Sequence, residues 1–409
     1  MPVTLPYDIV LLILSYLDPI PVDEAPLIDT PSSALRHQRE VGSTISLLSR
    51  DYVRHGQQLV FKHVVLSFSK EQVARRKLVL LVGNDHLADK VKRLFVFAGT
   101  HDVERTLALP LDLLLPSLTH LASLEVSSTP ALIERLVNPS SLVSARHLVH
   151  LTLISGHAAS PNYPSYLLAV LPQYLPDLES LTLRLQLSTS GSVPSRASIP
   201  NRRKAFTRLR SFEYSVMDST TGQTHLAADF LDALLDLVDG PTCPLSTLKV
   251  SSRTLPDSLA PFVRSCRSLE HLTIECGRMV LETYLDSFLE SVRDGASSST
   301  VRTLSLGVLP TWVAPLSPSR ESVDLLLETL SSLERIENVS LDFDLSSYEP
   351  DVREYLTRQT DANSSTTTTL ESFVSSGYDA VGSERLAVVW KRRRTGGWTR
   401  EQDLAADVW

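Results

Sequence analysis

The feature that most constrains this chain of 409 residues is a short block that recurs along most of its length. The block has the form apolar-x-x-apolar-x-apolar, as in Leu148-Val-His-Leu-Thr-Leu153. Its nine copies begin at residues 91, 121, 148, 178, 209, 245, 269, 301 and 336, so successive copies start 24 to 36 residues apart. Self-similarity at such a period indicates a solenoid, in which stacked repeats bury an apolar face that one repeat cannot bury alone.

The last three residues of each block predict a strand, because alternate side chains of a strand point to opposite faces. The apolar pair, such as Leu151 and Leu153, is expected in the core, and the residue between them and the one after are expected on the solvent face of the sheet. Helices are expected between the blocks, at 104–118, 163–175, 226–238, 257–266, 280–293 and 320–332. The pattern therefore predicts an α/β fold, a curved solenoid with parallel strands inside and helices outside.

The chain before the first copy has a different character. Residues 5–17 predict a short helix that is apolar on nearly every side, with Thr4 as its N-cap and Pro6 in its first turn. One face can pack on this chain, and the other needs a cover that another chain can supply. Residues 18–42, with closely spaced Pro and Asp, predict a loop; helix is expected again from about Ser43 to Gln58, followed by a strand over 64–68.

Two later segments interrupt the repeat. Residues 186–204 are rich in Ser, Pro and Arg and predict a flexible basic loop, and residues 360–369 resemble a Ser/Thr linker. After the linker, 370–375 predicts a degenerate tenth strand and 385–390 a terminal strand that caps the array. We therefore expect a small helical domain at 1–66, the solenoid at 67–359, the linker at 360–369 and a cap with a tail at 370–409.

The first 66 residues contain a recognisable set of positions: Leu5, Pro6, Asp8, Ile9, Ile13, Leu14, Leu17, the run Leu47-Leu48-Ser49-Arg50, and the closing segment 57–64. With these features they resemble an F-box, and the region after them resembles irregular leucine-rich repeats of the kind found in fungal F-box proteins. The sequence departs from that pattern in the insertion at 22–40 and in Tyr52, which stands where tryptophan is usual. The repeats keep the Leu-x-x-Leu-x-Leu core but lack the Asn or Cys that usually follows it.

The resemblance implies a substrate-recruiting adaptor of a Skp–cullin–F-box ubiquitin ligase. Such an adaptor performs no chemistry itself. The N-terminal helices would bind the Skp-family adaptor, and through it a cullin, by helix-in-groove docking. Carried onto this chain, the adaptor-binding residues are Leu5, Pro6, Ile9, Ile13, Leu14, Leu17, Leu47 and Leu48. The alternative is a leucine-rich-repeat scaffold for protein interactions that does not bind the Skp-family adaptor.

The solvent face of the sheet is the candidate surface for an unknown target protein, because such faces of solenoids are common binding sites. Arg184, Glu213, Lys249 and Glu275 alternate in sign over four consecutive repeats and are the candidate substrate-binding residues. A solvated face with self-compensating charges explains the same alternation equally well.

The remaining features argue against other classes. A net charge of −8 argues against a general nucleic-acid binder, and no apolar run approaches the length of a membrane span. Three cysteines without a paired spacing, and scattered histidines, indicate no metal site and a reducing, intracellular compartment. No catalytic or cofactor-binding motif is present, so we expect no enzyme and no cofactor. The basic run 391–394 is read as a solvated turn or a nuclear-import signal, which leaves cytoplasmic and nuclear locations both open.

Overall fold

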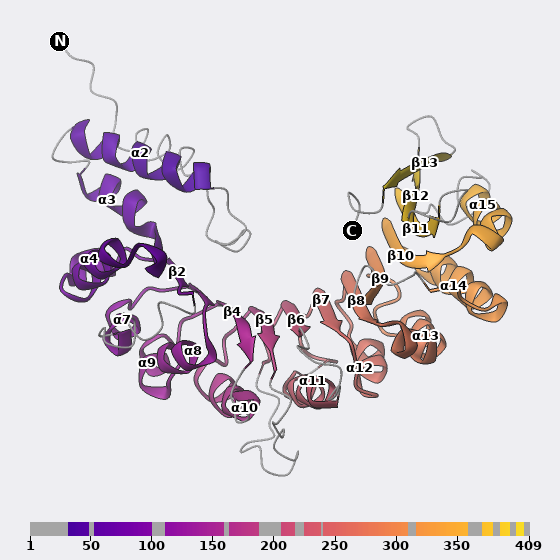
Figure 1. Cartoon of the computed structure of the whole chain (residues 1–409), viewed down its shortest axis with the longest axis horizontal. Helices are drawn as coiled ribbons and strands as arrows, with labels where there is room; N and C mark the ends of the chain where they lie inside the picture. The colour runs from indigo at the N-terminus through magenta and orange to yellow at the C-terminus, as the bar shows by residue number, and fades with distance from the viewer. Residues whose placement is uncertain are drawn as a thin grey trace. The chain divides into compact units, whose positions relative to one another are not determined.

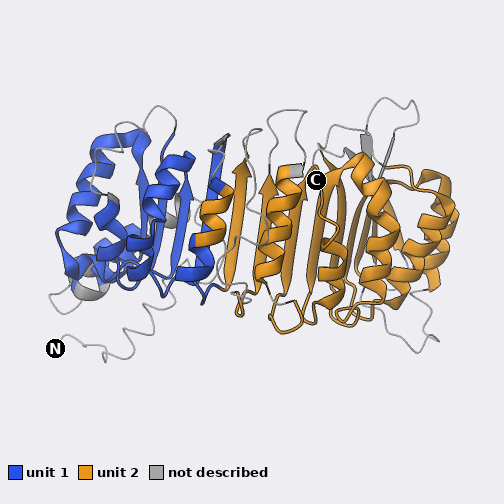
Figure 2. Ribbon diagram, turned by 90° about the horizontal axis from the view of Figure 1, so that it is seen from below, with its two compact units in different colours: residues 1–163, 170–178 blue, residues 164–169, 179–409 orange. Residues whose placement is uncertain are grey.

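The computed structural model describes residues 32–48, 53–99, 111–158, 163–187, 206–216, 225–238, 240–309, 316–358, 370–378, 385–392 and 398–404 (Figure 1). The chain divides into two compact units, residues 1–163 with 170–178 and residues 164–169 with 179–409 (Figure 2). The helix α10 (Tyr163–Tyr174) contributes residues to both units.

Unit 1 combines two N-terminal helices with a parallel sheet. Its elements are α2 (Ser32–Leu48), α3 (Val53–Lys62), β1 (His63–Ser67), η2 (Phe68–Lys70), α4 (Glu71–Val82), α5 (Asp85–Ala88), β2 (Arg93–Phe97), η4 (Leu111–Leu113), α7 (Leu114–Ser117), β3 (Ser123–Ser127), α8 (Pro130–Leu136), α9 (Pro139–Ser144) and β4 (His150–Ala158). The strands pair in chain order, and β1–β2, β2–β3 and β3–β4 are all parallel. The helices that follow β1 lie on one face of this sheet (Figure 1).

Unit 2 repeats the same arrangement of strand and helix. Its elements are β5 (Ser180–Gln186), β6 (Ser211–Val216), α11 (His225–Leu237), β7 (Thr247–Ser252), α12 (Leu259–Ser265), β8 (His271–Gly277), α13 (Arg278–Arg293), β9 (Thr303–Leu309), α14 (Arg320–Ser332), β10 (Asn338–Asp344), η6 (Ser346–Tyr348), α15 (Glu349–Arg358), β11 (Ser372–Tyr378), β12 (Arg385–Arg392) and β13 (Trp398–Leu404). Strands β5 to β11 are parallel, and β12 and β13 add two antiparallel strands at the end.

The apolar positions of each block form the core, as the repeat predicts. Leu151 and Leu153 of β4 are fully buried, and strands β6 and β7 show strict alternation between buried and half-exposed residues. In β6, the buried Tyr214 packs edge-on against Phe230 of α11, with ring centroids 6.0 Å apart. Its hydroxyl donates a hydrogen bond of 2.8 Å to the Ala227 carbonyl, so the helix is tied to the strand by a satisfied polar contact as well as by apolar burial.

A backbone ladder fixes the register at the start of the strands, at the opposite end from the asparagine that usually follows the core of such repeats. The Arg210 carbonyl accepts hydrogen bonds from the N–H groups of Ser246 and Thr247, at 2.8 and 2.9 Å. The same double acceptance recurs at the carbonyls of Lys92, Ala122, Glu179, Ser246, Glu270, Arg302 and Glu337. Each repeat therefore aligns the next through main-chain atoms, which do not depend on the identity of a side chain.

The loop predicted over 18–42 is wrong for its last part, because α2 begins at Ser32, directly after the last proline of that stretch. Residues 1–31 and 49–52 lie outside the described residues. Gly42, which reads as a helix breaker, allows α2 and α3 to pack closely: a Cβ there would lie 2.7 Å from the carbonyl oxygen of Gly56. The single helix expected from Ser43 to Gln58 is thus two helices.

The other expected elements are found with shifted bounds. The helix expected at 104–118 is reduced, within the described residues, to η4 and α7, and the five later ones correspond to α10, α11, α12, α13 and α14. The tenth strand is present as β11 and the strand predicted at 385–390 as β12, but β12 is not terminal because β13 pairs beyond it. The helices α4, α5, α8, α9 and α15 were not predicted either. The loop predicted over 186–204 begins too early, because Gln186 is the last residue of β5; residues 188–204 and the linker at 360–369 lie outside the described residues.

Candidate protein-interaction face

The sheet face of unit 2 that points away from the helices carries three rows of polar side chains. Parallel in-register pairing places equivalent positions of successive strands side by side. The first row is Ser180, Ser211, Thr247, His271, Thr303 and Asn338; the second is Thr182, Glu213, Lys249, Thr273, Ser305 and Ser340; the third is Arg184, Ser215, Ser251 and Glu275, and it ends at Gly307, which has no side chain. Serine and threonine dominate these rows, so the face offers many hydroxyls that both donate and accept.

Three of the four candidate residues form one charged cluster on this face. Glu213 of β6 lies directly opposite Lys249 of β7, and Arg184 of β5 approaches it diagonally. Arg184 Nε donates to Glu213 Oε1 at 2.9 Å, and Lys249 Nζ lies 4.0 Å from the same oxygen. The carboxylate is 19% exposed, whereas the two cations are 36% and 42% exposed. The cluster has a net charge of +1, and the carboxylate at its centre is partly shielded from solvent by the two cations.

The fourth candidate, Glu275, does not join the cluster. It lies in the third row, opposite Ser251 and Gly307, two residues along the strand from the position that faces Lys249. A Cβ on Gly307 would lie 3.1 Å from Glu275 Cγ, so the missing side chain gives the glutamate its space. Glu275 makes no ion pair with any residue in the part of the chain that the structure describes. Its carboxylate is therefore a hydrogen-bond acceptor separate from the charged cluster.

A separate line of charged residues lies just before the strands, outside the three rows. These residues were not singled out from the sequence. Arg302 bridges two acids, with Nε 3.5 Å from Glu270 Oε2 and Nη1 2.9 Å from Glu337 Oε1. Arg210 and Glu179 form a similar pair at 3.5 Å. These residues occupy the second position of the repeat block. An alignment of the block copies would have revealed them, because acidic and basic residues occur in turn at that position. Because the pairs are exposed, each contributes little to stability, about 0–1 kcal/mol.

In unit 1 two charged side chains on the corresponding face of the sheet are buried. Arg93 of β2 and Glu125 of β3 form an ion pair of 3.4 Å in which both side chains are only 2% exposed. Glu125 occupies the same block position as Glu213 and Lys249 and was expected to face solvent. This expectation is wrong, and Glu125 belongs to a buried pair instead of a binding surface.

The adaptor-binding residues predicted from the F-box resemblance lie mostly outside the described residues. This applies to Leu5, Pro6, Ile9, Ile13, Leu14 and Leu17. Leu47 and Leu48 occupy the last turn of α2. The assignment of these residues stays a prediction.

The buried thiols of unit 2 have environments that suppress reactivity. Burial raises the pKa of both Cys266 and Cys276 to about 12, with a smaller contribution from Cys243 at Cys266. Neither is a thiolate near neutral pH, and the thiolate is the nucleophilic form. Among the described residues, no group of three His, Cys, Asp or Glu side chains could hold a metal ion, and no helix combines the length and apolarity needed to cross a bilayer.

No protein-family model and no curated protein matches the chain. Among solved structures, one chain of the crystal structure of the Rad7 and Elc1 complex in yeast is similar to it. The TM-score is 0.26 and the identity is 14%, over 78% of this chain and 90% of the other. A similarity of this size carries no argument about function, which is therefore inferred below from the sequence and the site.

Proposed function

We propose that this protein is a substrate-recruiting adaptor of a Skp–cullin–F-box ubiquitin ligase. The N-terminal helices would bind the Skp-family adaptor, and the polar sheet face of unit 2 would bind the target protein. The observation that carries the proposal is that this face is open, polar and built on rigid strands. It holds the charged cluster Arg184–Glu213–Lys249 among hydroxyl side chains. The F-box resemblance supports the other half, and an adaptor of this kind needs no catalytic residue of its own.

The chemistry of the face indicates the kind of partner it fits. Arg184 and Lys249 offer charge-assisted hydrogen bonds to an acidic group, while Glu275 offers an acceptor to a basic one. Hydroxyls between them can pair with main-chain or side-chain amides. Arginine is also among the residue types that dominate binding energy at interfaces, which makes Arg184 the natural anchor.

The test is affinity capture of the full chain from cell extract, with the Skp-family adaptor and the co-captured proteins quantified by mass spectrometry. In Ile9→Asp with Leu17→Asp, loss of the adaptor with retention of the other partners is expected. In Arg184→Ala with Lys249→Ala, the opposite result is expected: the adaptor is retained and a target is depleted by about tenfold, which corresponds to about 1.4 kcal/mol.

Two outcomes would count against the proposal. If the wild-type chain does not capture the adaptor, the protein is a repeat scaffold outside such ligases. If Arg184→Ala with Lys249→Ala leaves every captured protein unchanged, the charged cluster is only a self-compensating surface. Ala substitution of Arg210, a matched arginine at the start of β6, controls for a general loss of positive charge.

A further inference from the structure

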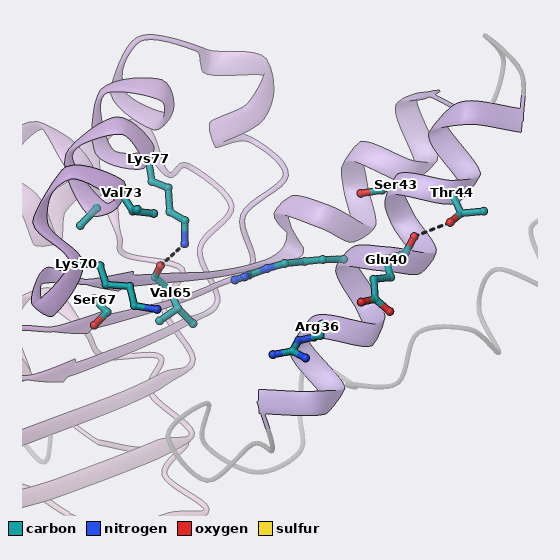
Figure 3. A pocket seen from close by; sticks show the side chains of 11 residues that line it. Arg36, Glu40, Ser43, Thr44, Val65, Ser67, Lys70, Val73 and Lys77 are labelled. Atoms are coloured by element: carbon teal, nitrogen blue, oxygen red, sulfur yellow. Dashed lines mark hydrogen bonds between the residues drawn. The ribbon is translucent and has the colours of Figure 1, made fainter.

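A second surface with the character of a binding site lies in unit 1, between α2, β1 and α4 (Figure 3). It is a hollow of about 750 Å³. Four cationic side chains and one carboxylate line it: Arg36, Arg39, Lys70 and Lys77, with Glu40. Figure 3 shows Arg36 and Glu40 on the α2 side, opposite Lys70 and Lys77. An acidic ligand would therefore meet a surplus of positive charge from two sides.

Most of these cations are available to a ligand. Arg36, Arg39 and Lys70 are exposed, and none of them forms an ion pair with another residue in the described ranges. Lys77 is half-buried, and its ammonium donates a hydrogen bond of 2.9 Å to the Val65 carbonyl. Burial, and after it the charge of Arg39, lowers the pKa of Lys77, so a carboxylate in the hollow would relieve an existing electrostatic cost.

The hollow also contains the free edge of a sheet. Strand β1 pairs only with β2 in the described structure, and the Val65 carbonyl points away from that strand toward Lys77. In a parallel pair the N–H and C=O of one residue point to the same side, so Val65 and Ser67 present main-chain groups to the hollow. Such an edge is a template for an added strand, and a lysine beside it is a common protection against unspecific pairing.

Apolar side chains continue the surface along α4. Val73 and Ala74 line the hollow, and Val73 is 50% exposed. Leu80, one turn beyond Lys77 on the same helix face, is 43% exposed. Exposed large apolar side chains next to a polar rim are typical of protein interaction sites. A free phosphate or a nucleotide would use the cations but not these neighbours.

We propose that this hollow binds a short, extended acidic segment of a partner protein, which adds to the edge of β1 and places its carboxylates among Arg36, Arg39, Lys70 and Lys77. Alternate side chains of the segment would face Arg36 and Arg39 of α2, and those between would face α4, where Lys77 lies beside Val73 and Leu80. The proposal does not depend on the ubiquitin-ligase function, since neither the sheet face of unit 2 nor residues 5–17 take part.

The experiment measures the fluorescence anisotropy of a labelled eight-residue peptide of alternating Glu and Val, titrated with the full chain. Arg39→Glu with Lys70→Glu should weaken binding by at least about tenfold, because two attractive charges become repulsive. Arg76→Glu is the matched control, since Arg76 is an exposed cation of α4 that does not line the hollow; a change below about twofold is expected there. Lys70→Gln tests the same site with a milder change and should give an intermediate loss. Circular dichroism spectra establish that the variants fold.

Further probes separate this proposal from other occupants. A peptide with N-methyl groups on alternate residues should bind about tenfold more weakly, because it cannot pair with the edge of β1. Equal binding of that peptide, or equal effects of Arg76→Glu and the double variant, would overturn the proposal. So would stronger binding of inorganic phosphate or of a single-stranded oligonucleotide. The acidic residues Asp23, Glu24 and Asp29 of this chain are tested by changing them to their amides: tighter peptide binding would mean that the protein's own segment is the occupant, which also refutes a partner.

Discussion

The buried ion pair between Arg93 and Glu125 gives a sharp test of how this sheet is stabilised. We predict that Glu125→Gln destabilises unit 1 by about 3–5 kcal/mol, because it breaks an ion pair whose two side chains are both buried. The magnitude follows from the geometry: the charged atoms lie 3.4 Å apart and both side chains are 2% exposed. Solvent can therefore neither screen the pair nor replace the lost partner.

The matched control is Glu213→Gln, the same chemical change at the same block position. Glu213 is 19% exposed and its partners Arg184 and Lys249 are more exposed still, so the loss should stay within about 1 kcal/mol. Both variants are measured by thermal unfolding followed by circular dichroism. For a unit of this size, each kcal/mol lowers the melting temperature by about 2–4 °C, so Glu125→Gln should lower it by about 6–20 °C.

A third variant distinguishes charge from packing. Arg93→Met with Glu125→Leu removes both charges and keeps most of the volume, so its stability should return to within about 1 kcal/mol of the wild type or exceed it. The reasoning would be refuted if Glu125→Gln unfolds at the same temperature as Glu213→Gln. It would also fail if the apolar double variant were less stable than Glu125→Gln alone, because the pair would then contribute through its specific hydrogen bonds.

Two further predictions concern unit 2, and the control for the first lies in β4 of unit 1. Gly277→Ala should lower the free energy of unfolding of unit 2, measured in urea, by about 1–3 kcal/mol, because a Cβ would lie 2.7 Å from the carbonyl oxygen of Arg253. In the control Gly156→Ala no atom lies within 4 Å of the new Cβ, so the free energy of unfolding should change by less than about 0.5 kcal/mol. Cys266 and Cys276, with pKa values raised to about 12, should resist iodoacetamide at pH 8 and react only after unfolding. Since the folded state holds their protons more tightly than a free thiol of pKa 9.0, their contribution to stability is full below pH 9 and falls as the pH rises toward 12. Alkylation of the folded chain at pH 8 would contradict this.

The repeat block predicts the sheet well because its information is local. Two apolar residues separated by one polar residue determine which side of a strand is buried, and Leu151 and Leu153 follow this rule without exception. Block position also predicts neighbours across strands, as for Glu213 and Lys249. The alternation of sign combines two positions of the block, since Arg184 and Glu275 lie in the third row and Glu213 and Lys249 in the second. Arg184 reaches Glu213 diagonally, whereas Glu275 makes no ion pair with a described residue.

What the sequence does not contain is the depth at which each residue lies. Glu125 and Glu213 have the same place in their blocks, yet their exposures are 2% and 19%. Block position determines the face of the strand, whereas exposure depends on what covers that face, which is a tertiary property. Helix α2 shows the same limit, because Gly42 in its interior allows a close approach to Gly56 of a separate helix, and the sequence does not show which helix lies there.

The regularity of the repeat also explains where binding chemistry can reside. The inward positions are committed to the core, and the backbone ladder at the start of the strands requires no particular side chain. The outward rows are therefore the positions at which residue identity can change with the least effect on folding. In unit 2 they carry hydroxyls and a few charges, and no aromatic residue occupies them from β5 to β10. Because aromatic anchors supply much of the affinity at interfaces and charges mainly supply selectivity and rate, this face is better suited to choosing a partner than to holding it alone. To hold the partner, the protein then needs a second contact with it. Even a weak second contact is sufficient, because the first contact raises the effective concentration of the partner at the second site.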